Sequence, residues 1–406
     1  PVPRGEELMR WARVIVITSV IASFGVATAV AMRGHTRVAA SPGWDVAGER
    51  SRRDADIAWY TMRAERDPTG AFDRLRLAAL YLQRARERGS PGDLLLAEQE
   101  ARRSLVNRRA HNSEAFRVLA IALIGQHRFA EAADATDSLL TADPTSHGAQ
   151  SLRAEIALEQ GDYPLADRLF TPLDHGGEDP AVTARVARWA AMRGRAGHAK
   201  ALLEQAREDA RRMAFTPAEQ IAWYDLRIGD LARTVGATRL AARALQAAAA
   251  VVPDDARVLL TQAQLALDTN DPADALEYAE AAMAHGGDPL ALALAAEAMR
   301  RLGRDQEAEQ RFRAFETLIA GVPGTAWHRQ WRLALLDRGR QVPAVLAQAE
   351  AELLTRKDVL GYDVYAWALH KAGRTDEARK AMHQALRWGT EDRLLDAHAK
   401  ALGMTR

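Results

Sequence analysis

The sequence predicts an all-α protein built from repeated helix pairs, and three observations support this prediction. From Asp54 to the end of the chain, apolar residues recur at helical spacing between short turns rich in Gly, Asp and Pro. No run of alternating β-branched residues is long enough to indicate a sheet. Small alanines also recur at a common period, at positions where a packed helix would ordinarily carry leucine.

The alanine period indicates where paired helices cross. When the segments are aligned on one alanine in the second helix of each pair, seven of the eight intervals are 33 to 36 residues and the other is 42. A leucine at a crossing would hold the two backbones apart, whereas alanine lets them approach. The aligned residues are Ala97, Ala132, Ala166, Ala199, Ala241, Ala275, Ala308, Ala344 and Ala378.

The segment from Ser113 to Ser146 resembles a tetratricopeptide repeat. Bulky Phe116, small Ala120 and terminal Pro144 fall where that family places its large, small and helix-ending residues. The resemblance extends from about Asp54 to the carboxyl terminus. It implies a right-handed α-solenoid of about nine helix pairs, whose first helices line a concave, partner-binding face.

Two units depart from the repeat. The 42-residue interval contains "EDARRMAFTPAEQ", where we expect Pro217 to restart a helix at its first turn. Arg332 occupies a position at which the repeat calls for a small residue. Both departures predict atypical packing at these points.

An uncharged segment near the amino terminus predicts a membrane helix. The 19 residues Val14 to Met32 carry no charge and would form a helix of roughly 28 Å, close to the thickness of the bilayer core. Trp11, between Arg10 and Arg13, is placed as an interfacial anchor. The alternative is a cleaved signal peptide, but the apolar run is longer than the usual core of such peptides.

The complete plan therefore has five parts. They are a short tail (1–13), a transmembrane helix or signal-anchor (14–32), a linker (33–53), the solenoid (54–390) and a carboxyl-terminal capping helix (391–406). Arginines on both sides of the apolar segment leave the positive-inside rule undecided, so the short tail sets our expectation that the repeats lie outside the cytoplasm. Export after signal-peptide cleavage would give the same location, periplasmic or extracellular.

Composition and motifs exclude several classes of function. The 55 basic and 54 acidic side chains leave no excess charge to attract nucleic acid, and the absence of cysteine excludes thiolate chemistry and Cys-ligated metals. No phosphate-binding loop, His-Glu-x-x-His pair, nucleophile turn or dinucleotide fingerprint is present. We therefore expect no catalytic residues, cofactor, metal or small-molecule substrate.

The resemblance instead implies a non-enzymatic scaffold for protein–protein interaction, presenting its groove to envelope or secreted partners. The alternative is a structural or assembly subunit of a larger membrane-protein complex. Arginine and tryptophan dominate binding energies at interfaces, although each residue alone also suits an ordinary solvated position. The predicted groove residues are Arg117, Glu155, Arg188, Trp223, Asp230, Arg233, Glu297, Arg300, Arg329, Asp363 and Trp367.

Overall fold

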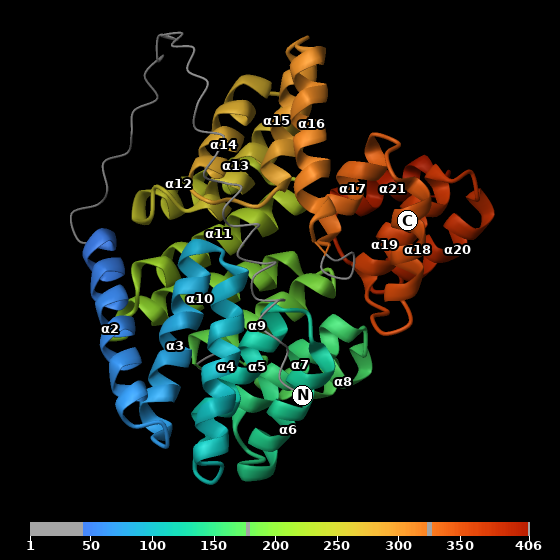
Figure 1. The fold of residues 1–406 in the computed structure, drawn as a ribbon. Helices are drawn as coiled ribbons and strands as arrows, with labels where there is room; N and C mark the ends of the chain where they lie inside the picture. The colour runs from blue at the N-terminus through green and yellow to red at the C-terminus, as the bar shows by residue number, and fades with distance from the viewer. Residues whose placement is uncertain (1–43, 176–178, 323–326, 405–406) are drawn as a thin grey trace, which may run out of the picture.

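A computed structural model describes residues 44–175, 179–322 and 327–404, and these residues form a stack of helix pairs (Figure 1). No β-strand occurs in the described ranges, so the all-α prediction is confirmed for them. The segment 14–32, predicted to cross a membrane, lies outside the described residues. Within the described part of the chain, no helix has both the length and the apolar character needed to span a bilayer.

Nine helix pairs follow one another along the chain, as the repeat predicts. Their first helices are α3 (Ala71–Arg88), α5 (Ser113–Gly125), α7 (His147–Gln160), α9 (Pro180–Met192), α11 (Ala218–Thr234), α13 (Ala256–Asp268), α15 (Leu290–Arg301), α17 (Arg329–Asp337) and α19 (Val359–Lys371). Their second helices are α4 (Pro91–Asn107), α6 (Phe129–Ala142), α8 (Tyr163–Phe170), α10 (Ala196–Arg212), α12 (Thr238–Val251), α14 (Pro272–Ala284), α16 (Asp305–Ala320), α18 (Val342–Glu352) and α20 (Thr375–Leu386). A short 3₁₀ helix, η1 (Thr171–Leu173), continues α8.

Local sequence sets the helix ends. The Ser90 hydroxyl accepts a hydrogen bond from the Asp93 amide, and the Asp162 carboxylate accepts one from Leu165, so each satisfies an amide in a first helical turn. A glycine in the left-handed backbone region follows three of the first helices. Gly161 follows α7 with φ of +79°, Gly303 follows α15 with +76°, and Gly373 follows α19 with +78°. Glycine adopts this left-handed backbone without strain, and the chain can then reverse into the second helix.

The aligned alanines occupy the crossings, with one exception. Eight of the nine are at most 1% exposed, which confirms the close approach of the paired helices. The prediction for Ala344 was wrong, because that residue is exposed while Val345 and Ala349 are buried. In α18, therefore, the buried stripe lies one residue later than the alignment on alanine suggests.

A single helix covers each end of the stack. Helix α2 (Val46–Arg66) packs on α3, with Ile57 and Ala64 against Leu77. It begins inside the predicted linker 33–53, because the Asp45 carboxylate caps it by accepting from the Gly48 amide. At the other end, α21 (Arg393–Ala401) packs on the last pair and forms the predicted closing helix.

The two irregular units pack atypically. Pro217 is the cap residue immediately before α11, so the chain restarts a helix there as expected. Arg332 is only 4% exposed, and its guanidinium forms an ion pair with Glu352. A charged group thus replaces the small residue at this seam, and the neighbouring helix supplies the compensating carboxylate.

The first helices line the inner side of the curved stack. Successive first helices contact one another in the described pairs, with the least contact between α9 and α11, where the 42-residue interval falls. Second helices are not in comparable contact with the next second helices in the described part of the chain. Because elements on the inside of a curve lie closer together, the first helices define the concave face.

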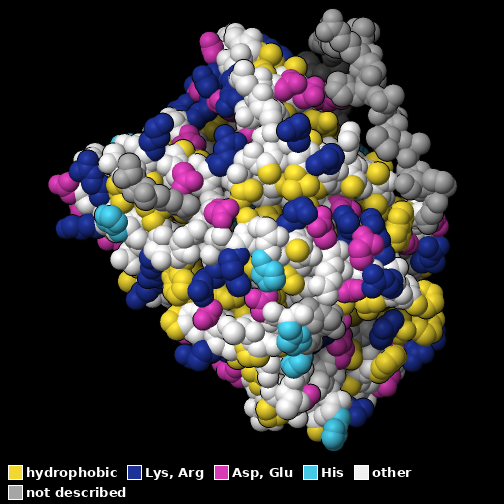
Figure 2. Space-filling view, turned by 180° about the vertical axis from the view of Figure 1, so that it is seen from behind, with side chains coloured by type: hydrophobic (Ala, Val, Ile, Leu, Met, Phe, Trp, Pro, Cys, Tyr) yellow, Lys and Arg dark blue, Asp and Glu magenta, His cyan; other side chains and the backbone are white. Residues whose placement is uncertain are grey.

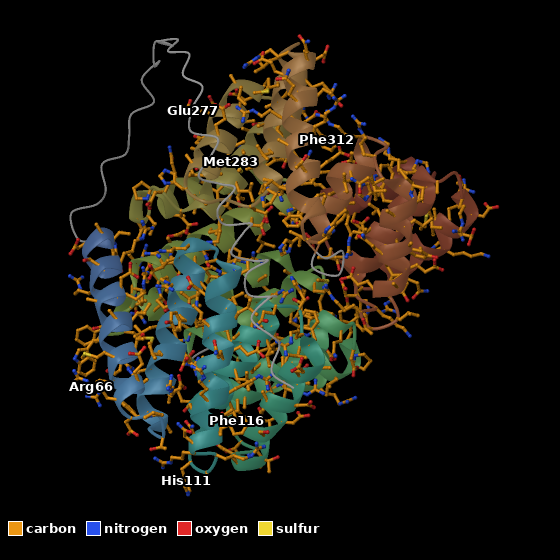
Figure 3. All side chains as sticks on the ribbon, in the orientation of Figure 1. Arg66, His111, Phe116, Glu277, Met283 and Phe312 are labelled. Carbon is orange, nitrogen blue, oxygen red and sulfur yellow. The ribbon has the colours of Figure 1, made fainter. Side chains whose placement is uncertain are left out.

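The first superhelical turn closes on itself through α2. The Glu49 carboxylate accepts a hydrogen bond of 3.0 Å from the Ala218 amide at the start of α11. Arg50 forms a two-pronged ion pair with Asp254, at 2.5 and 3.0 Å, just before α13. In Figure 3, Arg66 at the end of α2 and His111 between α4 and α5 mark the lower end of this turn, whereas Glu277 and Met283 belong to the upper stack of α13–α16.

The carboxyl-terminal pairs return to contact the middle of the chain. The Lys357 amide donates to the Gln160 carbonyl at 3.0 Å, and the Val359 amide donates to the Tyr163 hydroxyl at 2.6 Å. Thr390 donates to the Met192 carbonyl at 2.6 Å. One continuous apolar core therefore joins α7–α12 with α19–α21, and Figure 1 shows α18–α20 beside α8.

Tight turns make this return possible. A Cβ atom at Gly161 would lie 2.4 Å from the Lys357 carbonyl group, and one at Gly194 would lie 2.3 Å from the Gly389 oxygen. The turn glycines Gly303 and Gly373, by contrast, have no atom within 4 Å of such a Cβ. At Gly161 and Gly194, therefore, glycine is needed for the close backbone approach of the two parts of the solenoid.

Candidate partner-binding surface

The inner face of the first turn carries alternating acidic and basic side chains from successive first helices. The Glu155 carboxylate of α7 accepts from two residues of α9, Arg185 at 2.9 Å and Arg188 at 3.3 Å. On α5, Arg117 pairs with Glu114 of the same helix and remains 46% exposed. These groups confirm the first-helix positions predicted for Arg117, Glu155 and Arg188, while their role in binding stays a prediction.

Arg188 also connects this face to the returning end of the chain. Its guanidinium pairs with Glu159, whose other oxygen accepts from Arg356 at 3.0 Å. Burial alone would raise the pKa of Glu159, but Arg188 and Arg356 outweigh it and hold that pKa below its usual range. Glu159 is therefore ionised at neutral pH and joins the two parts of the solenoid.

Five further predicted residues lie on first helices in the middle of the stack. On α11, Trp223 is partly buried against the core, and its ring meets Tyr224 edge to face at 5.1 Å. Arg233 joins Asp230 at 3.4 Å and Asp268 of α13 at 3.1 Å. On α15, Glu297 pairs with Arg300 at 2.7 Å. These side chains keep partial contact with solvent.

The last three predicted groove residues are not available to a partner. Asp363 is fully buried and Trp367 is 9% exposed, because His398 of α21 covers both. The His398 ring stacks on Trp367 with centroids 4.1 Å apart, and its Nδ1 lies 2.7 Å from Asp363. Arg329 pairs with the other Asp363 oxygen at 2.5 Å and is itself largely buried. The prediction of Asp363 and Trp367 as groove contacts was therefore wrong.

The charges of this buried network are balanced. Burial would raise the pKa of Asp363, but Arg329 and then His398 outweigh it and hold that pKa below its usual range. An Asp with a lowered pKa contributes stability above its unfolded-state pKa and loses it as the pH falls through the folded-state value. The docking of α21 thus depends on an ionised Asp363.

The sequence analysis missed several inward-facing charges. Arg86 of α3, Glu219 of α11 and Arg257 of α13 are within electrostatic reach of one another. Arg257 pairs with Glu219 at 2.7 Å and with Asp255 at 2.6 Å. A signal for Arg86 and Arg257 was present, since both lie on first helices, but only the closure of the turn by α2 brings residues so far apart in sequence together.

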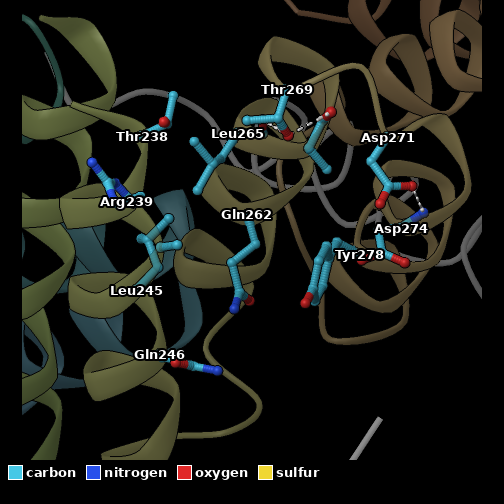
Figure 4. Close-up of a pocket in the computed structure, with 12 residues that line it drawn as sticks. Thr238, Arg239, Leu245, Gln246, Gln262, Leu265, Thr269, Asp271, Asp274 and Tyr278 are labelled. Atoms are coloured by element: carbon cyan, nitrogen blue, oxygen red, sulfur yellow. Dashed lines mark hydrogen bonds between the residues drawn. The ribbon is translucent and has the colours of Figure 1, made fainter. Parts of the chain in front are cut away.

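A separate recess of about 360 Å³ lies between α12, α13 and α14 (Figure 4). Leu245 and Leu265 give it an apolar lining, and Gln246, Gln262 and Tyr278 add polar groups. The Gln262 side-chain oxygen is buried there without a hydrogen-bond partner among the described residues. Because α12 and α14 are second helices, this recess does not belong to the inner face.

On the face seen from behind in Figure 2, basic and acidic side chains are interspersed. Among residues 44–175, 179–322 and 327–404, no cluster of His, Asp and Glu has the composition of a metal site. The inner face of the first turn is therefore the candidate site that the geometry defines best.

Comparison with known proteins gives a likeness of fold at low similarity. No protein-family model matches the chain, and no curated protein matches it. Among solved structures, PilW, described as a widely conserved type IV pilus biogenesis factor, is 18% identical, with 55% of this chain and 99% of that chain covered and a TM-score of 0.43. Pseudomonas aeruginosa PilF is 16% identical, with coverages of 55% and 94% and a TM-score of 0.41.

A tetratricopeptide repeat protein from Parabacteroides merdae is 14% identical, with 59% of this chain and 93% of that chain covered and a TM-score of 0.40. Its description agrees with the resemblance visible in the sequence. The TM-scores are below 0.5, so these likenesses carry no argument about function. The functional argument rests on the first helices of this chain and the side chains they present inward.

Proposed function

We propose that this chain is a non-enzymatic scaffold that binds a protein partner on the inner face of its first superhelical turn. The observation that carries the proposal is the contrast between the two ends of the stack. Arg117 on α5 and Arg188 on α9 keep 46% and 35% of their side chains exposed, and Glu155 of α7 pairs with Arg188. The corresponding face near the carboxyl terminus is covered by α21, where His398 stacks on Trp367 and meets Asp363.

A charge reversal tests this proposal. Arg117 forms an ion pair only with Glu114 on its own helix, so Arg117→Glu changes the inner face without breaking a contact between helices. Arg304→Glu is the matched control, because Arg304, the cap residue immediately before the second helix α16, also pairs with a glutamate three residues away, Glu307, and is similarly exposed. Chains carrying either substitution would be purified from native membranes together with their bound proteins.

We expect the inner substitution to deplete a co-purifying protein at least tenfold and the outer one to leave it unchanged. Equal recovery with both variants would overturn the assignment of the inner face. Loss with Arg304→Glu alone would favour the second candidate, an assembly subunit that binds along its outer side. The recess beside Gln262 supports that alternative, because it leaves a buried acceptor on the outer side unused.

The proposal includes a membrane anchor at residues 14–32, with the repeats on the periplasmic or extracellular side. The support is the uncharged apolar run in the sequence. Mass spectrometry of the mature amino terminus, together with protease treatment of intact cells, tests both parts. Retention of residues 14–32 with protease-accessible repeats supports the proposal, and protected repeats contradict the location.

A further inference from the structure

The loop between α10 and α11 presents an aromatic side chain that no other described residue covers. Phe215 is 100% exposed, the highest value among the large apolar side chains of the described residues, and Met213 in the same loop is 50% exposed. The loop lies within the 42-residue interval that departs from the repeat. Phe215 therefore contributes nothing to the packing of the helix pairs.

The backbone holds Phe215 in this exposed position. Its φ of +66° lies in the left-handed region, which a bulky residue rarely adopts. The Thr216 hydroxyl donates to the Ala210 carbonyl at 2.7 Å, and Pro217 is the cap residue before α11, so the loop is fixed on both sides. A strained residue whose side chain has no contact in the fold points to a contact outside it.

The loop lies close to the point where the chain enters the solenoid. The Ala218 amide donates to the Glu49 carboxylate, in the first turn of α2, at 3.0 Å. The Cα atoms of Phe215 and Ala218 can be at most about 11 Å apart. Residues 33–43, which precede the described part of the chain, span at most about 40 Å at full extension. A bilayer that held residues 14–32 would therefore be within reach of this loop.

The charges next to the loop are balanced. Three arginines near the end of α10 meet three carboxylates: Arg207 pairs with Asp225, Arg211 with Glu208 at 3.0 Å, and Arg212 with Asp209 at 2.7 Å. The loop thus offers an apolar contact, and these cations are already paired within the protein.

We propose that Phe215, together with Met213, inserts into the surface of the lipid bilayer that anchors the chain and so orients the solenoid on the membrane. The inference rests on the membrane anchor at residues 14–32 of the proposed function. One phenylalanine binds lipid weakly by itself, but the anchor makes the contact intramolecular and raises its effective concentration to about the millimolar range. Because the contact is apolar, zwitterionic lipid is sufficient.

A spin label in the loop tests the insertion in the full chain. The chain contains no cysteine, so Ala214→Cys introduces a single labelling site at an exposed residue. The labelled chain is reconstituted in phosphatidylcholine vesicles, and paramagnetic resonance measures how often the label meets lipid-soluble oxygen and a water-soluble nickel complex. The control is a label at Val106→Cys, an 86% exposed residue near His111 at the lower end of the first turn (Figure 3). We expect the label at 214 to meet oxygen more and nickel less than the control.

Phe215→Asn separates insertion from folding. Asparagine tolerates the left-handed backbone better than phenylalanine does, so this change should keep or raise the melting temperature of the detergent-solubilised chain. It should also lower the lipid-inserted fraction of the label at 214 at least about tenfold, because the aromatic surface is lost. Phe215→Leu keeps an apolar side chain and should retain most of the insertion. A lowered melting temperature for Phe215→Asn would show that the ring is structural and overturn the inference.

Three other results would also overturn it. A label at 214 that meets the nickel complex as often as the control label would show that the loop stays in water. Insertion only into vesicles that contain phosphatidylglycerol would mean that the arginines bind the lipid instead of Phe215. A label that is shielded in native membranes but not in pure lipid vesicles would mean that a protein partner covers the loop.

Flotation of the vesicles distinguishes this inference from the anchor on which it rests. If the chain floats with the vesicles while its label at 214 stays in water, the anchor stands and the insertion of Phe215 is wrong. If the chain does not float, the anchor itself is wrong and the insertion falls with it.

Discussion

Gly161→Ala tests the contact between the two parts of the solenoid, and Gly303→Ala is its natural control. Both glycines follow a first helix and have nearly the same φ, +79° and +76°. They differ in what an added methyl group would meet. At Gly161 it would lie 2.4 Å from the carbonyl carbon and oxygen of Lys357, and at Gly303 it would meet nothing within 4 Å.

The expected cost follows from this difference. A left-handed alanine costs roughly 1–2 kcal/mol at either position. At Gly161 the methyl group also forces the Lys357 backbone away, which endangers two hydrogen bonds: Lys357 amide to Gln160 carbonyl, and Val359 amide to Tyr163 hydroxyl. At about 1 kcal/mol for each bond, Gly161→Ala should lower the free energy of unfolding by about 2 kcal/mol more than Gly303→Ala.

Urea unfolding followed by circular dichroism measures both variants, and amide hydrogen exchange locates the effect. We expect faster exchange at Lys357 and Val359 in Gly161→Ala and no change there in Gly303→Ala. Equal losses of stability, with both amides still protected, would refute the contact on which this reasoning depends.

Three further outcomes are expected. Ala132→Leu, at a fully buried crossing, should cost about 1–3 kcal/mol by overpacking, while Ala344→Leu, at an exposed position, should change the urea midpoint little. Asp363→Asn should cost about 3 kcal/mol because it leaves Arg329 and His398 without their carboxylate, whereas Asp376→Asn, at a side chain 91% exposed, should cost less than about 0.5 kcal/mol in the same titration. Acidification should loosen the contact of His127 with His328, whose ring centroids are 5.5 Å apart. Burial, followed by the charges of His328 and Arg356, lowers the pKa of His127, and the opposing effect of Glu159 and Glu352 is smaller. The unfolded state then binds a proton first, so stability should fall as the pH drops through about 6.5, and His127→Gln should flatten this pH dependence of the melting temperature.

The helix pairs could be predicted because their information is local. Alanine at a crossing, glycine after a first helix and proline after a second helix act within one repeat, and their regular spacing makes them visible in a single sequence. The prediction for Ala344 failed because alanine is a good helix former and therefore also occurs at exposed helix positions. The neighbouring Val345 marks the buried side of α18.

The return of the carboxyl-terminal pairs could not be predicted from the repeat. The contacts of Arg356 with Glu159 and of Thr390 with Met192 join residues about six repeats apart, and they depend on the summed rotation of every pair between them. Small deviations in the rotation from one helix pair to the next accumulate over such a distance. Gly161 ends α7 in the left-handed backbone conformation, but its second role, to admit the Lys357 backbone, depends on this distant contact.

Only part of the candidate site could be predicted, because only the register within one repeat is local information. Arg117, Glu155 and Arg188 lie on the inner face because their register within one repeat is fixed. Trp367 follows the same register, yet α21 covers it, because the closing helix belongs to no repeat and its docking by His398 is a tertiary event. The ion pair of Arg257 with Glu219 was missed because it joins two different first helices, α13 and α11.

Disulfide crosslinking tests most directly the claim that the solenoid returns on itself. The chain contains no cysteine, so Gln160→Cys with Lys357→Cys introduces the only two thiols. A hydrogen bond of 3.0 Å joins their backbones, so the two Cα atoms lie no more than about 7 Å apart, close to the separation that a disulfide spans. We expect mild oxidation to give an intramolecular disulfide in the native protein and none in urea. Two free thiols in the native protein after oxidation would show that the ends stay apart, and the account would be wrong.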